Sequence, residues 1–228
     1  MSARCLKWST PLLALAASMT LAGASSPILA PGYGSLEYLP PAPGSYSLPS
    51  LGSAGNGAVL TSQSQRIQLH DLLGDKLVLL GFIYSHCSDI NGCPLASFVM
   101  KKVQNEVVRD EVLASRVRLI SLSFDPARDT PAVLTEYARH FKRQGFDWKF
   151  LTTASEQELQ PILAAYNQSL QKTYAEDGSA SGSFSHILRV FLIDEQRHIR
   201  NIYSTGFLHP ETVINDLRTL AQSSATIQ

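Results

Sequence analysis

An excess of charge of either sign is what this sequence most clearly lacks. Lys plus Arg and Asp plus Glu both total 19 among 228 residues, so the formal net charge at pH 7 is zero. A chain without a basic excess or an acidic run is neither an electrostatic nucleic-acid binder nor the bearer of a polyacidic tail. Charged residues make up 17% and apolar residues 44% of the chain, which excludes a disordered chain and allows a sizeable core.

Cysteine is also scarce. The three cysteines, Cys5, Cys87 and Cys93, are too few for a small domain held together by disulfides. The length fits one globular domain with appendages, and we find no internal repeat. Composition therefore predicts only a globular domain, and the function has to be sought around the cysteines.

The N-terminus has no apolar run of the roughly 20 residues that a membrane-spanning helix needs. Arg4 and Lys7 precede an uncharged, mainly apolar stretch over 11–24 that ends in small residues. A positive start, a short apolar run and a small-residue exit are the pattern of a signal peptide, which we assign to 1–24 with cleavage after Ala24. This pattern favours a cleaved signal over an uncleaved membrane anchor. The predicted location is the periplasm.

Cleavage would leave a mature chain with two cysteines, Cys87 and Cys93, and a formal charge of 17 − 19 = −2. An exported protein meets an oxidising compartment, in which thiols pair or hold metal. No cysteine follows the small residues at the end of the signal, which argues against a lipoprotein. The two remaining cysteines are therefore the leading functional candidates.

The next part of the chain, 25–58, is rich in proline, glycine and serine, with Glu37 as its one charged residue. Such a composition is typical of an irregular linker. Its end, 46–51, is predicted as a first edge strand, and Tyr33, Tyr38 and Tyr46 are expected to dock it. We divide the chain into a signal peptide 1–24, a linker 25–43, a domain 44–222 and a C-terminal tail 223–228.

Strand and helix patterns alternate from Leu77 onward. The continuous apolar runs 77–84 and 117–124 are typical of central strands covered on both faces, and we expect them to be parallel neighbours. The predicted order is strand 77–84, helix from Pro94, strand 117–124, helix from Pro131, strand 148–151, helix after Ser155, hairpin 188–193 with 199–203, and helix from Pro210. This order predicts a thioredoxin-like α/β fold, a central mixed sheet flanked by helices with a β-hairpin near the C-terminus.

The loop between the first of these strands and its helix carries both cysteines. Cys93 directly precedes Pro94, so we place it at the helix N-terminus, where unpaired N–H groups and the helix dipole favour a thiolate. Its pKa is therefore expected to lie below the free value of about 8.5. Cys87 lies six positions earlier at the strand end, and Asn91-Gly92 lets the loop fold back. The two sulfurs are predicted to form a disulfide or to hold a soft metal.

A soft cation such as copper(I) held by two thiolates usually takes an imidazole as well. His186 lies just before strand 188–193, and in a thioredoxin-like sheet the loop before that strand faces the cysteine loop. His86 is expected to point away from Cys87, its neighbour in sequence. Of the other histidines, His140 is expected at a helix C-terminus. His70, His198 and His209 are expected in solvent.

Structural alternatives remain open for each of these residues. Cys87 and Cys93 can form a structural disulfide, although closing so short a loop gains little chain entropy. His186 can be a surface or capping histidine, and Asp89 is expected as a turn residue. For Asp125, Arg128 and Asp129 we favour a helix cap with a local ion pair over a role in orienting the site or a partner.

Four blocks resemble the SCO/SenC family of thioredoxin-fold copper proteins that serve cytochrome c oxidase assembly. The resemblance covers roughly 44–222. The blocks are Leu79 to Cys87 (LLGFIYSHC), Cys93-Pro94-Leu95, Ser123 to Pro131 (SFDPARDTP, similar to SVDPxRDTP) and His186 to Asp194 (HILRVFLID). The resemblance implies Cys87, Cys93 and His186 as a copper site. It also implies a role in delivering copper, or electrons for the receiving cysteines, to the binuclear copper centre of the oxidase.

Two departures from the family pattern bear on that expectation. Five residues separate Cys87 from Cys93, where the family has three, and Ser185 stands where the family usually has aspartate before the histidine. The wide spacing keeps open a second function, in which Cys87 and Cys93 are the redox pair of a thiol–disulfide oxidoreductase that carries no metal. The predicted partner is the copper-centre subunit of the oxidase or another exported thiol or copper protein. Nucleic acid is not expected as a partner, and a membrane association remains open.

Overall fold

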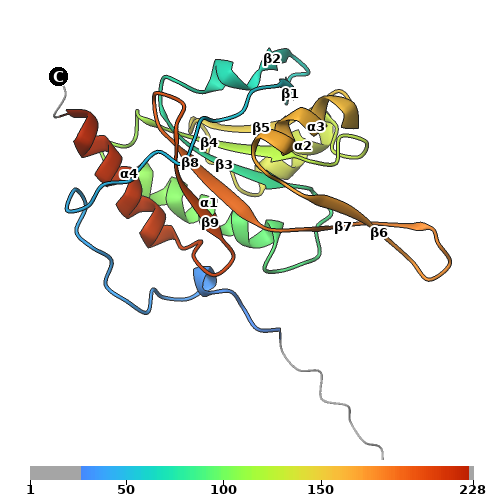
Figure 1. The fold of residues 1–228 in the computed structure, drawn as a ribbon, viewed down its shortest axis with the longest axis horizontal. Coiled ribbons are helices and arrows are strands. Elements are labelled where there is room, and N and C mark those ends of the chain that lie inside the picture. The colour runs from blue at the N-terminus through green and yellow to red at the C-terminus, as the bar shows by residue number, and fades with distance from the viewer. Residues whose placement is uncertain (1–26, 226–228) are drawn as a thin grey trace, which may run out of the picture.

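The computed structural model describes residues 27–225, so the predicted signal peptide lies outside the described residues. Its core is a seven-stranded sheet in the order β2-β1-β5-β4-β3-β8-β9. The elements are η1 Pro31–Tyr33, β1 Ala58–Thr61, β2 Arg66–Gln68, η2 Leu69–Leu72, β3 Leu77–Ile83, α1 Cys93–Val107, β4 Val117–Ser123, α2 Pro131–Arg139, β5 Trp148–Thr152, α3 Glu156–Ala165, β6 Leu170–Tyr174, β7 Ala180–His186, β8 Arg189–Ile193, β9 Ile199–Ser204 and α4 Pro210–Ala225. The predicted thioredoxin-like α/β order is confirmed (Figure 1).

The two central strands are as expected from their apolar runs. All seven residues of β3 and all seven of β4 are buried, and the strands pair in parallel from Leu77 opposite Val117 to Ile83 opposite Ser123. Strand β8 pairs with β3 in the antiparallel sense and with β9 as the predicted hairpin. The sheet is therefore mixed, and its buried centre fixes where β3 ends and the cysteine loop begins.

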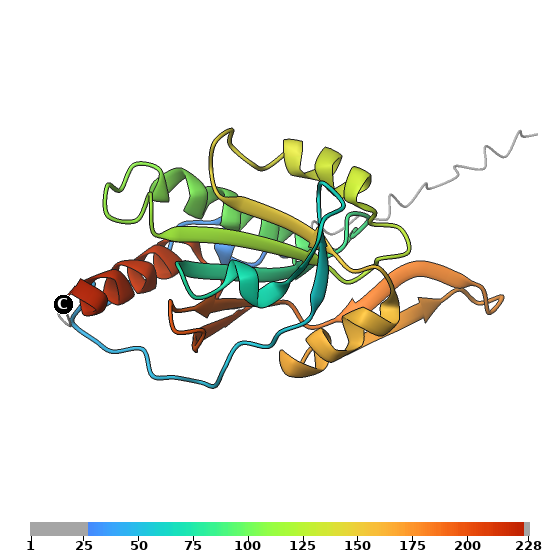
Figure 2. The ribbon, with the colours of Figure 1, turned by 90° about the horizontal axis from the view of Figure 1, so that it is seen from above.

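Helices cover both faces of the sheet, with α2 above and α3 below it in Figure 2. Helix α1 lies on the face of Gly81, where an added Cβ would come within 3.3 Å of the Met100 sulfur, and α2 joins α1 through Ser97 and Tyr137. The opposite face carries α3, since Tyr166 at its end packs edge-on against Phe82. Helices α2 and α3 begin at the predicted caps, Thr130 and Ser155.

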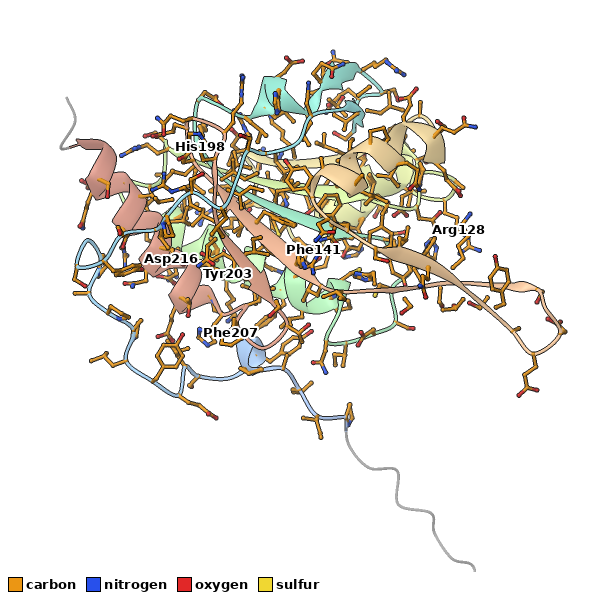
Figure 3. The ribbon with its side chains drawn as sticks, viewed as in Figure 1. Arg128, Phe141, His198, Tyr203, Phe207 and Asp216 are labelled. Carbon is orange, nitrogen blue, oxygen red and sulfur yellow. The ribbon has the colours of Figure 1, made fainter. Side chains whose placement is uncertain are left out.

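Apart from the short helix η1, the N-terminal segment 27–57 is irregular, as its composition predicts, but it is bound to the domain along α4 (Figure 1). Gly44 N–H donates to Thr219 Oγ1 at 3.1 Å, and Tyr46 donates to Asp216 at 2.5 Å, which confirms a docking tyrosine. Asp216 also accepts from Tyr203, beside it in Figure 3. The predicted edge strand over 46–51 is wrong. Backbone pairing with β9 begins only at Leu51, because the prolines and glycines of this segment leave few residues free to form a ladder.

Strands β6 and β7 form a separate two-stranded sheet, which we call the arm, Leu170–His186. The arm extends from the body of the domain in Figures 1 and 2. The sequence patterns did not predict it, and they placed His186 in a loop, whereas His186 is the last residue of β7. Within residues 27–225, no helix has both the length and the apolar character to cross a bilayer.

Candidate metal and redox site

The cysteine side of the site lies at the corner between β3 and α1. Strand β3 ends at Ile83, and α1 begins at Cys93 with Gly92 as its N-cap, so Cys93 lies at the helix N-terminus as predicted, although the helix starts one residue before Pro94. Cys93 is fully buried, whereas Cys87 in the preceding loop is half-buried. The two cysteines thus differ in solvent access, although they share one short loop.

The arm supplies the third predicted residue. His186 pairs with Leu170 at the base of the arm, and its Nε2 lies 3.8 Å from the sulfur of Cys93. The ligand atoms of Cys87, Cys93 and His186 all lie within 4.8 Å of one another. Three residues separated by up to 99 positions therefore converge at one place.

Aromatic rings hold the imidazole of His186 in place. Its centroid lies 4.8 Å from that of Phe124 and 6.3 Å from that of Tyr84, both in edge-on geometry. Phe184, from the same strand as His186, packs against both of these rings at 5.2 and 5.4 Å. Because aromatic side chains have few rotatable bonds, such a cluster restricts the ring at little entropic cost.

The thiol pKa values reverse the expectation from the sequence. The pKa of Cys87 is lowered to about 4, first by a hydrogen bond from Cys93 and further by contacts with His186 and Tyr84. The pKa of Cys93 is raised, chiefly because burial disfavours its charged form. The prediction of a thiolate at Cys93 is therefore wrong: desolvation of a fully buried sulfur outweighs the helix N-terminus, and Cys87 becomes the thiolate.

The donor set fits a soft metal ion. Two sulfurs and one imidazole nitrogen suit copper(I) or zinc, and no carboxylate belongs to the group found among the described residues. Ligand distances of about 2.0–2.3 Å place two donors of one ion roughly 4 Å apart, close to the separations seen here. The three side chains are thus positioned for a small ion without a rearrangement of the fold.

The same geometry is compatible with thiol chemistry. Cys87 and Cys93 are both free thiols in this structure. The predicted Cys87–Cys93 disulfide needs the sulfurs about 2.05 Å apart, and it remains a prediction. A partly exposed thiolate beside a buried thiol is the arrangement of an attacking and a resolving cysteine.

The longer cysteine loop has a structural use. Asn91 accepts from Ala30 N–H at 2.8 Å and donates to the Ile28 carbonyl at 2.8 Å. Tyr33 donates to the carbonyl of Ile90 at 2.5 Å, which confirms that this tyrosine docks the N-terminal segment. The loop residues between Cys87 and Cys93 therefore hold 28–33 beside the site.

Other residues are mostly where the sequence places them. His86 is exposed and hydrogen-bonds Ser85 rather than joining the site, and Asp89 accepts from Asn91 N–H as a turn residue. His140 is the C-cap of α2, as expected. His209 is buried and not in solvent, because its ring faces the carbonyl of Gly34 in the docked N-terminal segment.

Sequence reasoning did not single out Tyr84, and for Arg128 and Asp129 it favoured a local ion pair and helix cap over contacts with the rest of the site. Tyr84 hydrogen-bonds Cys87. The tyrosine's pKa is raised to about 12, first by burial and second by this hydrogen bond. The favoured local pair of Arg128 with Asp125 is present at 3.9 Å, but Arg128 also contacts the arm, and Asp129 contacts Ser85 instead of capping the helix. The sequence signals for these residues were the place of Tyr84 at the end of a buried run and of Arg128 and Asp129 within the block SFDPARDTP.

Comparisons with known proteins agree with this arrangement. The SCO1 protein homolog of Bacillus subtilis is 29% identical over 114 residues, which cover 50% of this chain and 56% of that protein. The structure of Bradyrhizobium japonicum ScoI with copper bound gives a TM-score of 0.61 at 24% identity, over 74% of this chain and 99% of that one. The structure of BsSco, described as a member of the Sco family of cytochrome c oxidase assembly proteins with a disulfide switch, gives a TM-score of 0.59 at 21% identity, over 76% and 96%.

These structures share the fold, and the alignment with the Bacillus subtilis relative spans little more than half of that protein. A family model, however, covers most of the domain that contains Cys87, Cys93 and His186. Because the SCO1/SenC model matches residues 58–222, from β1 almost to the end of α4, this chain belongs to the SCO1/SenC family.

Proposed function

We propose that this protein is an exported copper-binding metallochaperone that holds copper through Cys87, Cys93 and His186. The convergence of two sulfurs and an imidazole within 4.8 Å is the observation that carries the proposal. Membership in a family whose solved relatives include ScoI with copper bound supports copper as the ion. The cargo would go to the binuclear copper centre of cytochrome c oxidase, as the assembly role named for BsSco suggests.

A three-coordinate site suits transfer. Cys87 is half-buried and Cys93 is fully buried, so a receiving protein can approach the ion from the Cys87 side. A partner thiolate would bind the ion first and then displace one of the three donors at a time. The ion would therefore keep ligands at every step of the transfer. The expected partner is the copper-centre subunit of the oxidase or another exported protein with exposed thiols.

The test is copper titration of the reduced mature domain, followed by spectra of the copper(II) form. The proposal predicts one copper per chain and an intense thiolate-to-copper band that Cys87→Ser or Cys93→Ser abolishes. Ser88→Ala, in the same loop, is the matched control and should bind copper like the wild type. A wild-type domain that takes up no copper would overturn the proposal.

The difference between the two thiols favours a second candidate, thiol–disulfide exchange. The Cys87 thiolate would attack a partner's disulfide and form a mixed disulfide with one of its sulfurs. Cys93 would then lose its proton, attack Cys87 and release the partner with two reduced thiols, leaving a Cys87–Cys93 disulfide. An external dithiol would have to reduce that disulfide for another cycle. Reduction of an oxidised copper-centre domain in equimolar amount, absent in Cys87→Ser, identifies this activity.

Export to the periplasm is part of the proposal. It rests on the charged start, the apolar stretch 11–24 and the small residues that follow it. Fractionation of cells that express the full chain, with mass spectrometry of its N-terminus, should find a periplasmic protein that begins after Ala24. A full-length chain in the membrane fraction would identify an uncleaved anchor instead.

A further inference from the structure

The loop between β4 and α2 contacts both segments that carry the donors: the cysteine loop, which we call the cysteine half, and the arm, which we call the histidine half. Its residue Asp129 is fully buried and accepts the backbone N–H of Ser85 at 3.0 Å, the Ser85 hydroxyl, and the Ser123 hydroxyl at 2.5 Å. Ser85 lies two residues before Cys87. A buried carboxylate that lost such donors would pay a desolvation penalty, so Asp129 holds the start of the cysteine loop firmly.

The preceding residue, Arg128, contacts the other half. Its Nη1 donates to the Gly182 carbonyl at 2.7 Å, and Figure 3 shows Arg128 beside the arm. Gly182 lies in β7, four residues before His186, with a φ of +77°. A Cβ there would come within 2.3 Å of Arg128 Nη1, so this close approach depends on glycine.

Asp125 places a carboxylate beside the Arg128 guanidinium. The Asp125 side chain is buried, its Oδ2 accepts no hydrogen bond, and it lies 3.9 Å from Arg128 Nη1. Asp125, Arg128, Gly182 and Phe184 line one small cavity of about 140 Å³ between the loop and the arm. The negative charge therefore stabilises the guanidinium where it meets the arm.

The arm needs such an attachment. It forms its own sheet and shares no ladder with the seven-stranded sheet. Besides Arg128, Phe184 packs against Tyr84 and Phe124 near its base. The ion pair of Lys172 with Glu156 of α3 also ties it to the domain at 2.6 Å, and both partners of that pair are about half exposed. The Arg128 side chain is exposed to a similar degree, at 48%, but it differs from that pair in its partner. The ion pair joins two flexible side chains, whereas the charge-assisted bond of Arg128 to the Gly182 carbonyl contacts the backbone of β7 directly.

We propose that Arg128 and Asp129 are positioning residues that set the spacing between the two halves of the donor group. Asp129 holds the cysteine half through Ser85, and Arg128 holds the histidine half through Gly182. Because the two are adjacent in the chain, one rigid turn, closed by the N–H groups of both residues on the Asp125 carbonyl, fixes both halves relative to each other. Where this inference is tested by copper binding, it rests on the proposed copper function.

A double-mutant cycle tests which half each residue serves. Arg128→Gln and Ser85→Ala are made in the wild type and in His186→Ala, and copper(I) retention is measured against a chelator. Ser85→Ala replaces a substitution of the fully buried Asp129, which risks unfolding the domain. Arg139→Gln is the matched control, since Arg139 is an exposed arginine that pairs with Glu136 in α2.

The expected result is asymmetric. Arg128→Gln should weaken copper retention about three- to tenfold in the wild type and have no further effect in His186→Ala, because its effect passes through the histidine. Ser85→Ala should weaken retention in both backgrounds, and Arg139→Gln in neither. An Arg128→Gln effect of equal size in both backgrounds would overturn the assignment.

A second readout needs no metal. Hydrogen exchange of the amides in 180–186 of the copper-free protein should be several-fold faster in Arg128→Gln than in the wild type, and unchanged in Ser85→Ala and Arg139→Gln. Unchanged exchange in Arg128→Gln refutes the positioning role whether or not the domain binds copper. Faster exchange in a domain that binds no copper supports the positioning role and refutes the copper function alone.

Discussion

The cysteine corner and the arm bring the same site together in different ways. The corner is part of the core, with β3 fully buried and Cys93 at the first residue of α1. The arm has its own two-stranded sheet and is tied to the domain largely by side chains. The comparison indicates a site with two donors placed by the main sheet and α1 and a third, His186, placed by a separate two-stranded sheet. In such a site the two sulfurs can keep the ion bound while the imidazole is the donor that is displaced when the ion is released.

The largest expected effect lies in the corner. Cys93→Ser should lower copper(I) affinity by more than about 100-fold, since it removes a donor that the core holds in place and leaves a hard hydroxyl. Competition with a chelator of known affinity measures the change. Thermal unfolding should show that the variant remains folded, because serine and cysteine are close in size. Retention of wild-type affinity would mean that the corner is not the metal site.

The arm should contribute less. His186→Ala is expected to lower copper(I) affinity about 10- to 100-fold and to change the free energy of unfolding by less than about 1 kcal/mol, because His186 lies outside the main sheet. The same chelator competition, with urea unfolding, checks both values. His86→Ala, at the exposed neighbour of Cys87, is the control and should change neither. An affinity loss as large as that of Cys93→Ser would remove the distinction between the two regions.

The pH dependence of the thiols sharpens the comparison within the corner. With its pKa lowered to about 4 from the usual value near 8.5, Cys87 is a thiolate above pH 4 and loses that charge as the pH falls through 4. Alkylation of the reduced protein should therefore proceed at pH 5–6 at Cys87, while buried Cys93, with its raised pKa, stays unmodified. Peptide mapping by mass spectrometry locates the adduct. An adduct at Cys93 alone would contradict the assignment.

The smallest effect concerns the docked N-terminal segment. Asn91→Ala removes two hydrogen bonds to 28–30 and should cost about 1 kcal/mol, because the N–H of buried Ala30 loses its acceptor while the carbonyl of exposed Ile28 can turn to water. Limited proteolysis should cut near 28–33 faster, with copper affinity changed less than in His186→Ala. Asn105→Ala, within α1 and away from the docked segment, is a control of the same residue type. An Asn91→Ala variant with wild-type proteolysis would show that the loop does not hold this segment.

Sequence patterns predicted the corner well and the arm poorly. The apolar run of β3 and the Cys93-Pro94 start of α1 are local signals that the core enforces. The arm has a polar, glycine- and serine-containing sequence with no alternation, so its strands are defined by contacts with Arg128 and α3 that no local pattern carries. The thiol pKa order was wrong for the same reason, because the burial of Cys93 comes from the tertiary fold.

The most direct test of the central claim is X-ray absorption spectroscopy of the copper(I)-loaded mature domain, compared with His186→Ala. Our account predicts two sulfur ligands and one imidazole nitrogen around the copper in the wild type, with the nitrogen contribution lost in the variant and both sulfurs retained. A wild-type spectrum without imidazole, or one unchanged by His186→Ala, would contradict it.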